Sequence, residues 1–411
     1  MSKKKRSPRP GVPLTVLTLL AAAAAVVALL LPFHALSPAA GKNIAPAPQI
    51  YTFSGTIQAG EPSLRRALKD AAPEEDEGSV RAQALLESMS LDEKVGQMFI
   101  ARCPKGDGAK LAAEYHLGGY ILFASDFKGK NPEQVSREIA QYQQAVSVPL
   151  LIGVDEEGGG VVRVSKYPAF REAPFPSPRE LWLSGGQEAV RSDTEEKCGL
   201  LHSLGINVNF APVCDVSQDP EDYIYRRTLG EDAEATAQYV RAVVETMGES
   251  GVASVLKHFP GYGGNGDTHT GLVYDNRPME AFEASDFFPF QAGIDAGADM
   301  VLVSHNIVAA MDSQYPASLS SAVHEILREK LGFTGVIVTD DLYMDGIRDF
   351  TGDEKAAVLA VQAGNDLLCC TDFQTQVPAV LAAVERGEIT EDRIDQSVLR
   401  ILNLKLSLGL L

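Results

Sequence analysis

Residues 335–341 read GVIVTDD, an apolar run that ends in two carboxylates. Val336, Ile337 and Val338 would be apolar on both faces of a strand, which is typical of a parallel strand covered by helices. The two acidic residues follow at the C-terminal end of that strand, where a charge is costly to bury unless it is paired or used. This stretch therefore predicts a buried parallel strand that delivers a functional carboxylate.

Seven further runs of this kind precede or follow it, and stretches with a helical pattern separate them. Eight strand and helix units over roughly 320 residues fit a closed (β/α)8 barrel of the TIM type, in the α/β class. An open doubly wound sheet is the alternative, but no GxGxxG motif follows the first strand to support it. The other runs are VGQMFIA from Val95, GGYILFA from Gly118, PLLIGVD from Pro149, INVNFAPV from Ile206, VASVLKHF from Val252, DMVLVSH from Asp299 and DLLCC from Asp366.

The first 79 residues differ in composition from the rest of the chain. Residues 1–11 are basic, residues 12–33 contain an uncharged apolar run, and residues 34–79 are rich in Pro, Ala and charge. The basic stretch would stay in the cytoplasm, so the apolar run predicts export, as a retained membrane anchor or as a signal segment cleaved near Ala39 or Ala40. A buried core helix is the alternative for that run. Residues 34–79 are the expected linker and residues 80–411 the single barrel domain.

Charge and cysteine usage exclude other classes of protein. The formal charge of −19 at pH 7 should repel nucleic acid. Cysteines are scattered and without CxxC spacing, which suggests neither a zinc site nor a disulfide framework but small core residues. They are Cys103, Cys198, Cys214, Cys369 and Cys370.

Polar side chains end five of the predicted strands, and a barrel would gather them on the face where barrel enzymes build their sites. Any one of them could simply form hydrogen bonds that cap the barrel rim, but five strand ends together favour a site. They are Asp155-Glu156-Glu157, Asp215, Lys257-His258, His305-Asn306 and Asp340-Asp341.

The glycine-rich stretch KHFPGYGGNGDTHTG, residues 257–271, predicts a loop. Asp267 and His269 lie two positions apart on it, close enough for the carboxylate to orient the imidazole, although an ordinary surface histidine is the alternative. Of Asp340 and Asp341, only one can readily face the barrel mouth. A carboxylate nucleophile with a separate proton donor is the arrangement that cleaves a glycosidic bond in two steps with retention.

At these residues the sequence resembles glycoside hydrolase family 3, and within it the single-domain β-N-acetylglucosaminidase branch. The resemblance spans Ser90 to Leu411. Its motifs occur in the order of the family: LDEKVGQMF, GGYILF, VDEEGGGVVR, NFAPVCDV, YRRTLGED, KHFPGYG with DTH, VLVSH and GFTGVIVTDDLYMDGI. Two positions depart from the pattern, Tyr262 in place of the usual His and Gly160 in place of the usual Arg.

The resemblance implies a role for each matched residue. Asp340 is the implied nucleophile, and His269 the acid/base with Asp267 as its partner. Arg227 is preferred to Arg226 by the register of the motif. The implied sugar-binding residues are Asp155, Arg163, Arg227, Lys257 and His258.

The predicted activity is the retaining, exo-acting release of terminal β-linked N-acetylglucosamine from saccharides derived from the cell wall. It implies no metal or organic cofactor. We expect a monomer that works outside the cytoplasm, tethered to the membrane by its N-terminal segment or secreted after cleavage. The alternatives are a β-N-acetylglucosaminide phosphorylase, a β-glucosidase of the same family, and a membrane-tethered saccharide-binding protein without catalysis.

Overall fold

The structure is a computed structural model that describes residues 77–266, 271–352 and 355–411. The expected cytoplasmic segment, the apolar segment and nearly all of the expected linker lie outside these residues, as do Asp267 and His269. Within the described part of the chain, no helix has both the length and the apolarity to cross a membrane.

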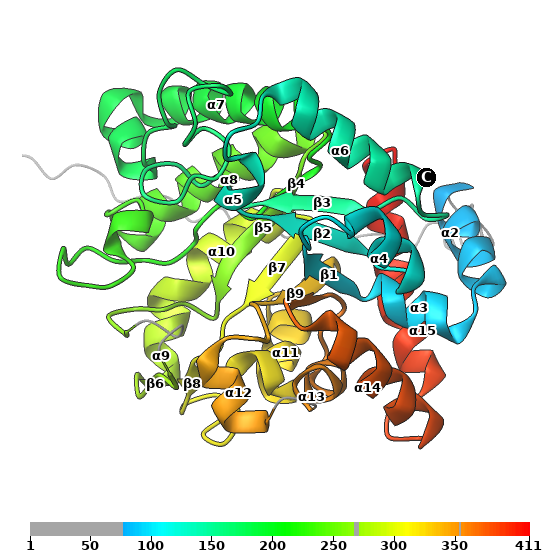
Figure 1. Ribbon diagram of the computed structural model, residues 1–411. Helices are drawn as coiled ribbons and strands as arrows, with labels where there is room; N and C mark the ends of the chain where they lie inside the picture. Colours follow the sequence, from blue (N-terminus) through cyan, green and yellow to red (C-terminus); the bar gives the residue numbers. More distant parts are fainter. Residues whose placement is uncertain (1–76, 267–270, 353–354) are drawn as a thin grey trace, which may run out of the picture. The chain divides into compact units, whose positions relative to one another are not determined.

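Eight parallel strands form the main sheet (Figure 1), in the order β10-β1-β2-β3-β4-β5-β7-β9. The sheet closes on itself where Val338 pairs with Leu367 and the Thr339 N–H donates to the Leu367 carbonyl at 3.1 Å. The predicted (β/α)8 barrel is therefore confirmed. The strands are β1 (Phe99–Arg102), β2 (Gly119–Leu122), β3 (Leu151–Val154), β4 (Val208–Asn209), β5 (Ala253–Phe259), β7 (Met300–Val303), β9 (Val336–Thr339) and β10 (Leu368–Cys370).

Every predicted strand run contains an observed strand, but the first run also contains part of a helix. Val95 to Gln97 belong to α3 (Leu91–Gln97), and β1 begins only at Phe99. Ser90 caps this helix: its hydroxyl accepts from the Glu93 N–H, and the Glu93 carboxylate accepts from the Ser90 N–H at 2.8 Å. These two bonds form a capping box, and it starts a helix that continues into the apolar run.

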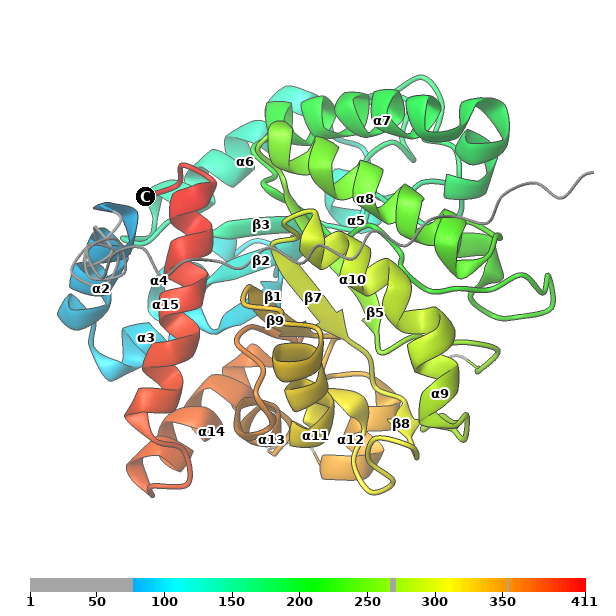
Figure 2. The same cartoon turned by 180° about the vertical axis from the view of Figure 1, so that it is seen from behind.

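The helices surround the strands on the outside of the barrel (Figures 1 and 2). Apolar side chains from the two layers meet there, and all described residues of β2, β3, β5, β7, β9 and β10 are buried. The main outer helices are α4 (Gly108–Glu114), α6 (Pro132–Gln144), α7 (Pro178–Leu204), α8 (Ala233–Glu249), α10 (Phe287–Asp295), α11 (Ser321–Glu325), α13 (Ala356–Ala363) and α14 (Phe373–Glu385). All the cysteines are buried and free, as expected of core residues.

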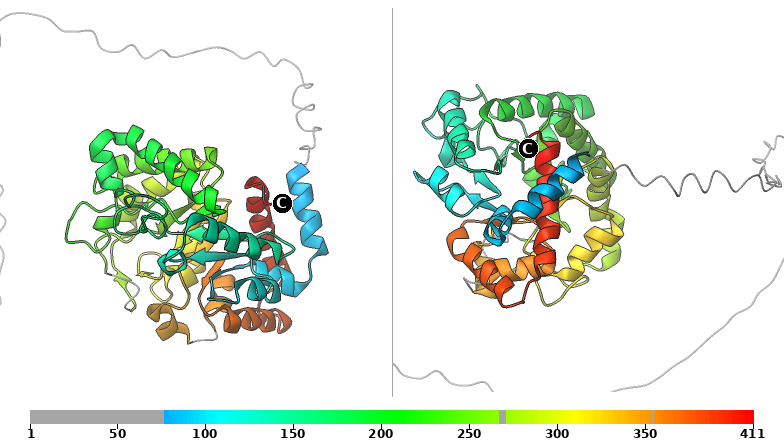
Figure 3. Two further views of the ribbon diagram at one scale, coloured as in Figure 1. Left: turned by 45° about the horizontal axis from the view of Figure 1, so that its top comes forward. Right: turned by 90° about the vertical axis from the view of Figure 1, so that its right-hand side faces the viewer.

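The C-terminal helix α15 (Glu391–Ser407) packs against α3 and against α2 (Glu77–Ser88), as Figure 3 shows. Lys405 of α15 donates to the Gln97 side chain at 2.6 Å, and Arg400 donates to Asp366 at 3.0 Å. Because Gln97 precedes β1 and Asp366 precedes β10, these contacts lie at the N-terminal ends of the strands. The C-terminal ends therefore remain available for a site.

A second, two-stranded sheet was not predicted. It pairs β6 (Tyr274–Asp275) with β8 (Ile307–Val308) in parallel. Each strand has only two residues, too short for an apolar period to stand out from the loops around it. Asp275 of β6 is buried and, as described below, binds the segment that follows β5.

Candidate active site

A cavity of about 420 Å³ lies at the C-terminal ends of the barrel strands. Residues from opposite sides of the barrel line it, among them Arg102 at the end of β1 and Lys257 of β5. The chain therefore gathers the predicted nucleophile and the predicted sugar-binding residues around one space. Those lining residues are Asp155, Arg163, Arg227, Lys257, His258 and Asp340.

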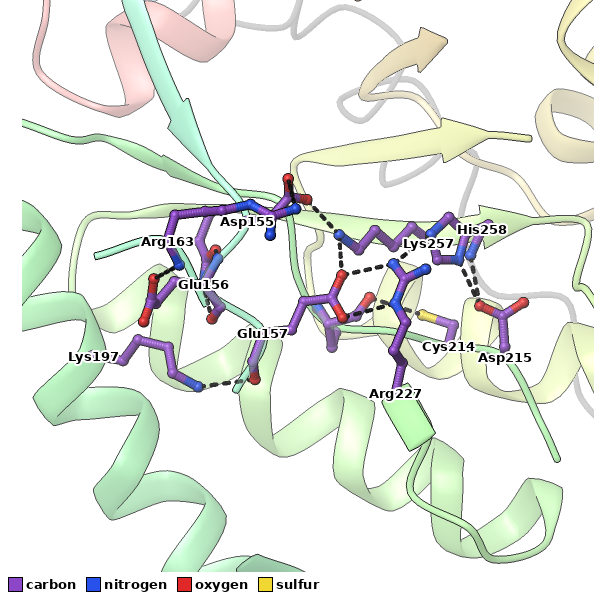
Figure 4. Close-up of polar contacts among 12 residues, drawn as sticks. Asp155, Glu156, Glu157, Arg163, Lys197, Cys214, Asp215, Arg227, Lys257 and His258 are labelled. Atoms are coloured by element: carbon purple, nitrogen blue, oxygen red, sulfur yellow. Dashed lines mark hydrogen bonds and ion pairs between the residues drawn. The ribbon is translucent and has the colours of Figure 1, made fainter. Parts of the chain in front are cut away.

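A network of carboxylates and cations forms one wall of the cavity (Figure 4). Lys257 Nζ lies 2.8 Å from Asp155 Oδ1 and 2.6 Å from Glu157 Oε1. Glu157 also accepts two hydrogen bonds from Arg227, and Arg163 Nη2 lies 3.4 Å from Asp155 Oδ2. Three cations and two carboxylates thus alternate along the wall. Each fixes the position of its neighbours, because charge-assisted hydrogen bonds are short and directional.

Glu157 is the residue of this network that the sequence analysis did not assign to the site. Burial by itself would raise the pKa of Glu157, but the charges of Arg227 and Lys257 outweigh it and hold that pKa well below its ordinary value. Burial would likewise lower the pKa of Arg227, and Glu157 reverses this effect. The pair therefore stays ionised in the protein interior. In the sequence, the only sign of this role was that Glu157 is the second of two acidic residues that follow Asp155.

Glu156 has a different role from the acidic residues on either side of it. Its buried carboxylate accepts from the backbone N–H groups of Arg163 and Val164 at 2.8 Å and of Ser165 at 3.1 Å, and from the Ser165 hydroxyl. These bonds fold the segment after β3 back on itself. As a consequence, Arg163 reaches the cavity beside Asp155.

His258 lies inside β5, and it contacts Arg227 and Asp215. Its Nε2 is 2.9 Å from Arg227 Nη2, and its Nδ1 is 2.7 Å from Asp215 Oδ2. Burial and the charge of Arg227 lower the pKa of His258, so the imidazole is neutral. Asp215 was predicted to end a strand, but its contact with His258 could not be predicted from the sequence.

The adjacent carboxylates after β9 have distinct surroundings. Asp341 accepts from the Thr371 N–H at 3.0 Å, from the Thr371 hydroxyl at 2.5 Å and from the Tyr343 N–H at 3.0 Å. Asp340 lines the cavity, and its Oδ1 accepts from the Asp341 N–H at 2.9 Å. Asp341 lines the cavity as well, so the expectation that only one of the two carboxylates can face the barrel mouth is wrong. β9 ends at Thr339, and the alternation of a strand does not continue through the two carboxylates. The bonds from Thr371 and Tyr343 nevertheless give Asp341 a structural role.

An aromatic and basic edge of the cavity was missed by the sequence analysis. The Arg102 guanidinium lies 4.5 Å from the centre of the Phe123 ring, and Arg163 lies 5.9 Å from the same ring. Tyr223, from the segment before Arg227, also lines the cavity. Arg102 and Phe123 are at or near the ends of β1 and β2, so strand position was the only signal that could have found them.

The segment after β5 leads along the chain to Asp267 and His269. The Tyr262 N–H donates to Asp215 Oδ1 at 2.7 Å, and the Asn265 side chain donates to Asp275 at 2.7 Å. Asp267 and His269 themselves lie outside the described residues, so their position relative to Asp340 stays a prediction. In the described ranges, no three His, Cys, Asp or Glu side chains are grouped as metal ligands.

Comparisons with known proteins agree with this architecture. Residues 90–404 match the family model of the glycosyl hydrolase family 3 N terminal domain. The chain is 32% identical over 335 residues to the beta-hexosaminidase LpqI of Mycobacterium tuberculosis, covering 77% of this chain and 83% of that protein. It also resembles a solved structure titled M tuberculosis LpqI, with a TM-score of 0.72 and 30% identity, over 79% of this chain and 96% of that one.

A second solved structure is the glycoside hydrolase family 3 beta-N-acetylglucosaminidase from Paenibacillus sp. str. FPU-7. The TM-score is 0.73 and the identity 36%, over 79% of this chain and 63% of that one, so this chain spans somewhat less than two thirds of that protein. The barrel, the polar residues at its strand ends and the match over residues 90–404 lead to one conclusion: this chain belongs to glycoside hydrolase family 3.

Proposed function

We propose that this enzyme is a retaining β-N-acetylhexosaminidase that releases terminal β-linked N-acetylglucosamine. The observation that carries the proposal is that Asp340 lines the same cavity as the ionised array of Asp155, Lys257, Glu157 and Arg227. The names of the relatives, a beta-hexosaminidase and a beta-N-acetylglucosaminidase, support the choice of sugar.

In the proposed reaction, Asp340 attacks the anomeric carbon while His269 protonates the departing oxygen, and a glycosyl-aspartate results. Neutral His269 then activates the water that releases the sugar, and Asp267 orients the imidazole. Asp341 accepts the hydrogen bonds of Thr371 that hold this turn in place, and the turn in turn holds Asp340 at the cavity.

The charged wall would bind the sugar in the reactive position. Asp155 can accept hydrogen bonds from sugar hydroxyls, and Arg163 and Arg227 can donate to them. Because these side chains already bind one another, they need little reorganisation when the sugar arrives, which favours catalysis by preorganised charge. Lys257 binds both Asp155 and Glu157, so we expect it to act mainly by holding these two carboxylates in place.

The location and the natural substrate are parts of the same proposal. The basic and apolar segments at residues 1–33 support export, with the domain tethered to the membrane or released after cleavage. A tethered enzyme would meet cell-wall saccharides first, so we propose these as the substrate. We further propose that the enzyme acts as a monomer from the end of the saccharide chain.

A panel of aryl β-glycosides tests the sugar and the reaction. We expect release of the aryl group from the N-acetylglucosaminide well above that from the glucoside, with overall retention, and no release by the Asp340→Asn variant. Free sugar as the product in phosphate buffer supports hydrolysis, whereas a sugar phosphate would identify a phosphorylase. A preference for the glucoside would overturn the proposed sugar specificity.

A further inference from the structure

Asp215 is a fully buried carboxylate that lies outside the lining of the cavity. It follows β4, yet its hydrogen-bond partners belong to β5 and to the segment directly after it. Oδ2 accepts from the His258 backbone N–H at 3.1 Å and is 2.7 Å from His258 Nδ1, and Oδ1 accepts from the Tyr262 N–H at 2.7 Å. One side chain therefore binds His258 and the start of the following segment (Figure 4 shows the histidine side of this contact).

These contacts decide which nitrogen of His258 carries its proton. An ionised carboxylate can only accept, so Nδ1 must hold a hydrogen to bond Asp215 at 2.7 Å. Arg227 can only donate, so Nε2 must offer its lone pair to Arg227 Nη2 at 2.9 Å. Both neighbours thus select the same neutral tautomer, with the proton on Nδ1.

The tautomer in turn determines how Arg227 presents itself to the cavity. Its Nε donates to Glu157 Oε2 at 3.0 Å, and its Nη2 serves both Glu157 Oε1 at 2.7 Å and His258 Nε2. A guanidinium has five N–H donors, so the two on Nη1 remain. Among the residues that the structure describes, none accepts from Nη1, which leaves these donors for a substrate hydroxyl.

We propose that Asp215 is a positioning residue of the active site, which fixes His258 in the Nδ1–H tautomer and through it the orientation of the Arg227 guanidinium. This inference rests on the proposed function, because it assumes that Arg227 binds the sugar. Both ring nitrogens of His258 are occupied by Asp215 and Arg227, so His258 acts on the sugar through Arg227. It extends that function by adding a residue that touches no substrate. The chain of contacts runs from Asp215 to His258, then to Arg227 and Glu157.

Replacement of Asp215 by Asn changes the pattern of donors while keeping the shape of the side chain. The amide has one acceptor oxygen and one NH2 group, so it cannot accept from both His258 and Tyr262. With its oxygen facing His258, the amide opposes the Tyr262 N–H. With its NH2 group facing His258, it shifts the imidazole proton to Nε2, where that proton opposes the donor on Arg227. This second mismatch weakens the hydrogen bond between His258 and Arg227 without removing any residue from the cavity.

Two measurements on the full chain test this directly. Long-range 1H–15N correlation of the imidazoles, with the signal of His258 identified from the His258→Gln variant, reports the tautomer. We expect Nδ1–H in the wild type and a mixture of Nδ1–H and Nε2–H in Asp215→Asn. We also expect kcat/KM for an aryl N-acetylglucosaminide to fall on the order of 10²-fold to 10⁴-fold, as when the carboxylate partner of a functional histidine is neutralised.

Asp299→Asn is the matched control. Asp299 is a partly buried aspartate that also binds β5, where it accepts from the backbone N–H and the hydroxyl of Ser254 at the opposite end of the strand. The same substitution there should leave the tautomer of His258 and kcat/KM unchanged. A general effect of losing a buried carboxylate would instead appear in both variants.

The outcomes separate the two proposals. An Nε2–H tautomer in the wild type overturns the positioning role even if Asp215→Asn does not fold. A folded Asp215→Asn variant with wild-type kcat/KM overturns it as well. If the wild-type enzyme cleaves none of the glycosides, the proposed function is wrong. The tautomer measurement would then still test whether Asp215 fixes the Nδ1–H form of His258.

Discussion

Glu157 binds Arg227 through two parallel hydrogen bonds, from Nε to Oε2 at 3.0 Å and from Nη2 to Oε1 at 2.7 Å. Arg171 and Glu196 form the same fork on the surface, at 2.8 and 3.1 Å. The two pairs differ in solvent: the side chain of Glu157 is 2% exposed and that of Glu196 is 56% exposed. Equal geometry with unequal burial allows the energetic effect of burial to be measured.

Glu157→Gln should lower the free energy of unfolding by about 3–5 kcal/mol, because Arg227 and Lys257 would lose the buried carboxylate that they share. Glu196→Gln should change it by less than about 1 kcal/mol, because water screens and replaces the exposed pair. Urea denaturation of both variants at pH 7 measures the difference. Similar losses in the two variants would contradict the importance of the buried network.

Asp340→Asn should affect mainly the activity of the enzyme, and Asp341→Asn mainly its stability. The first should reduce turnover on the order of 10⁴-fold or more and leave the melting temperature almost unchanged, as expected for a nucleophile. The second should cost about 1–3 kcal/mol of stability, because the Thr371 N–H and hydroxyl lose their charged acceptor. Steady-state kinetics and thermal unfolding separate these effects, and an active Asp340→Asn variant would refute the assigned nucleophile.

Gly261→Ala should destabilise the segment between β5 and β6. Gly261 has φ +121°, and an added Cβ would lie 2.2 Å from Asp286 Oδ1. Asp286 cannot move aside easily, because both of its oxygens bind Arg277, which also donates to the Gly261 carbonyl at 3.2 Å. We expect a loss of about 1–3 kcal/mol from strain and crowding.

Gly266→Ala is the control for this prediction. An added Cβ at Gly266 meets no atom of the described residues within 4 Å. The free energy of unfolding should therefore stay within about 0.5 kcal/mol of the wild type. If urea denaturation shows an equally small change in the free energy of unfolding for Gly261→Ala, then the contact with Asp286 can relax and the prediction is wrong.

Lys405→Met should change how stability depends on pH. Burial lowers the pKa of Lys405 from 10.5 to about 7, and the Gln97 side chain is its hydrogen-bond acceptor at 2.6 Å. Between pH 7 and 10.5 the unfolded chain binds more protons at this position than the folded one, so the wild type gains stability as the pH rises through this window. Below pH 7 the cost of burying the charge is fully present.

The variant has no such titration, so its stability relative to the wild type should be highest near pH 6. We expect this relative stability to fall by about 2–3 kcal/mol between pH 6 and pH 9. Urea denaturation of both proteins at each pH gives the difference, and Lys330→Met, at an exposed ion pair, should show no comparable trend. A pH-independent difference for Lys405→Met would contradict a shifted pKa.

Local patterns predicted the barrel because each strand is short and apolar on both faces. Residues 336–338 are an example: three apolar residues, all buried in β9. The boundary of β1 was wrong, because the predicted run began at Val95, whereas Val95 to Gln97 continue the helix capped at Ser90. The sheet of β6 and β8 was missed, because two-residue strands carry no periodic signal.

The sequence by itself determined the repeated strand and helix units, and with them the face of the barrel on which Asp155, Lys257 and Asp340 lie. These features follow from local periodicity and from chain direction, which every strand repeats. Only the tertiary structure decided which carboxylate binds which cation, that Asp341 rather than Asp340 is bound by Thr371, and that Asp215 binds His258. Such pairings join residues far apart in the chain, and their energies depend on burial and distance, which exist only once the barrel has closed.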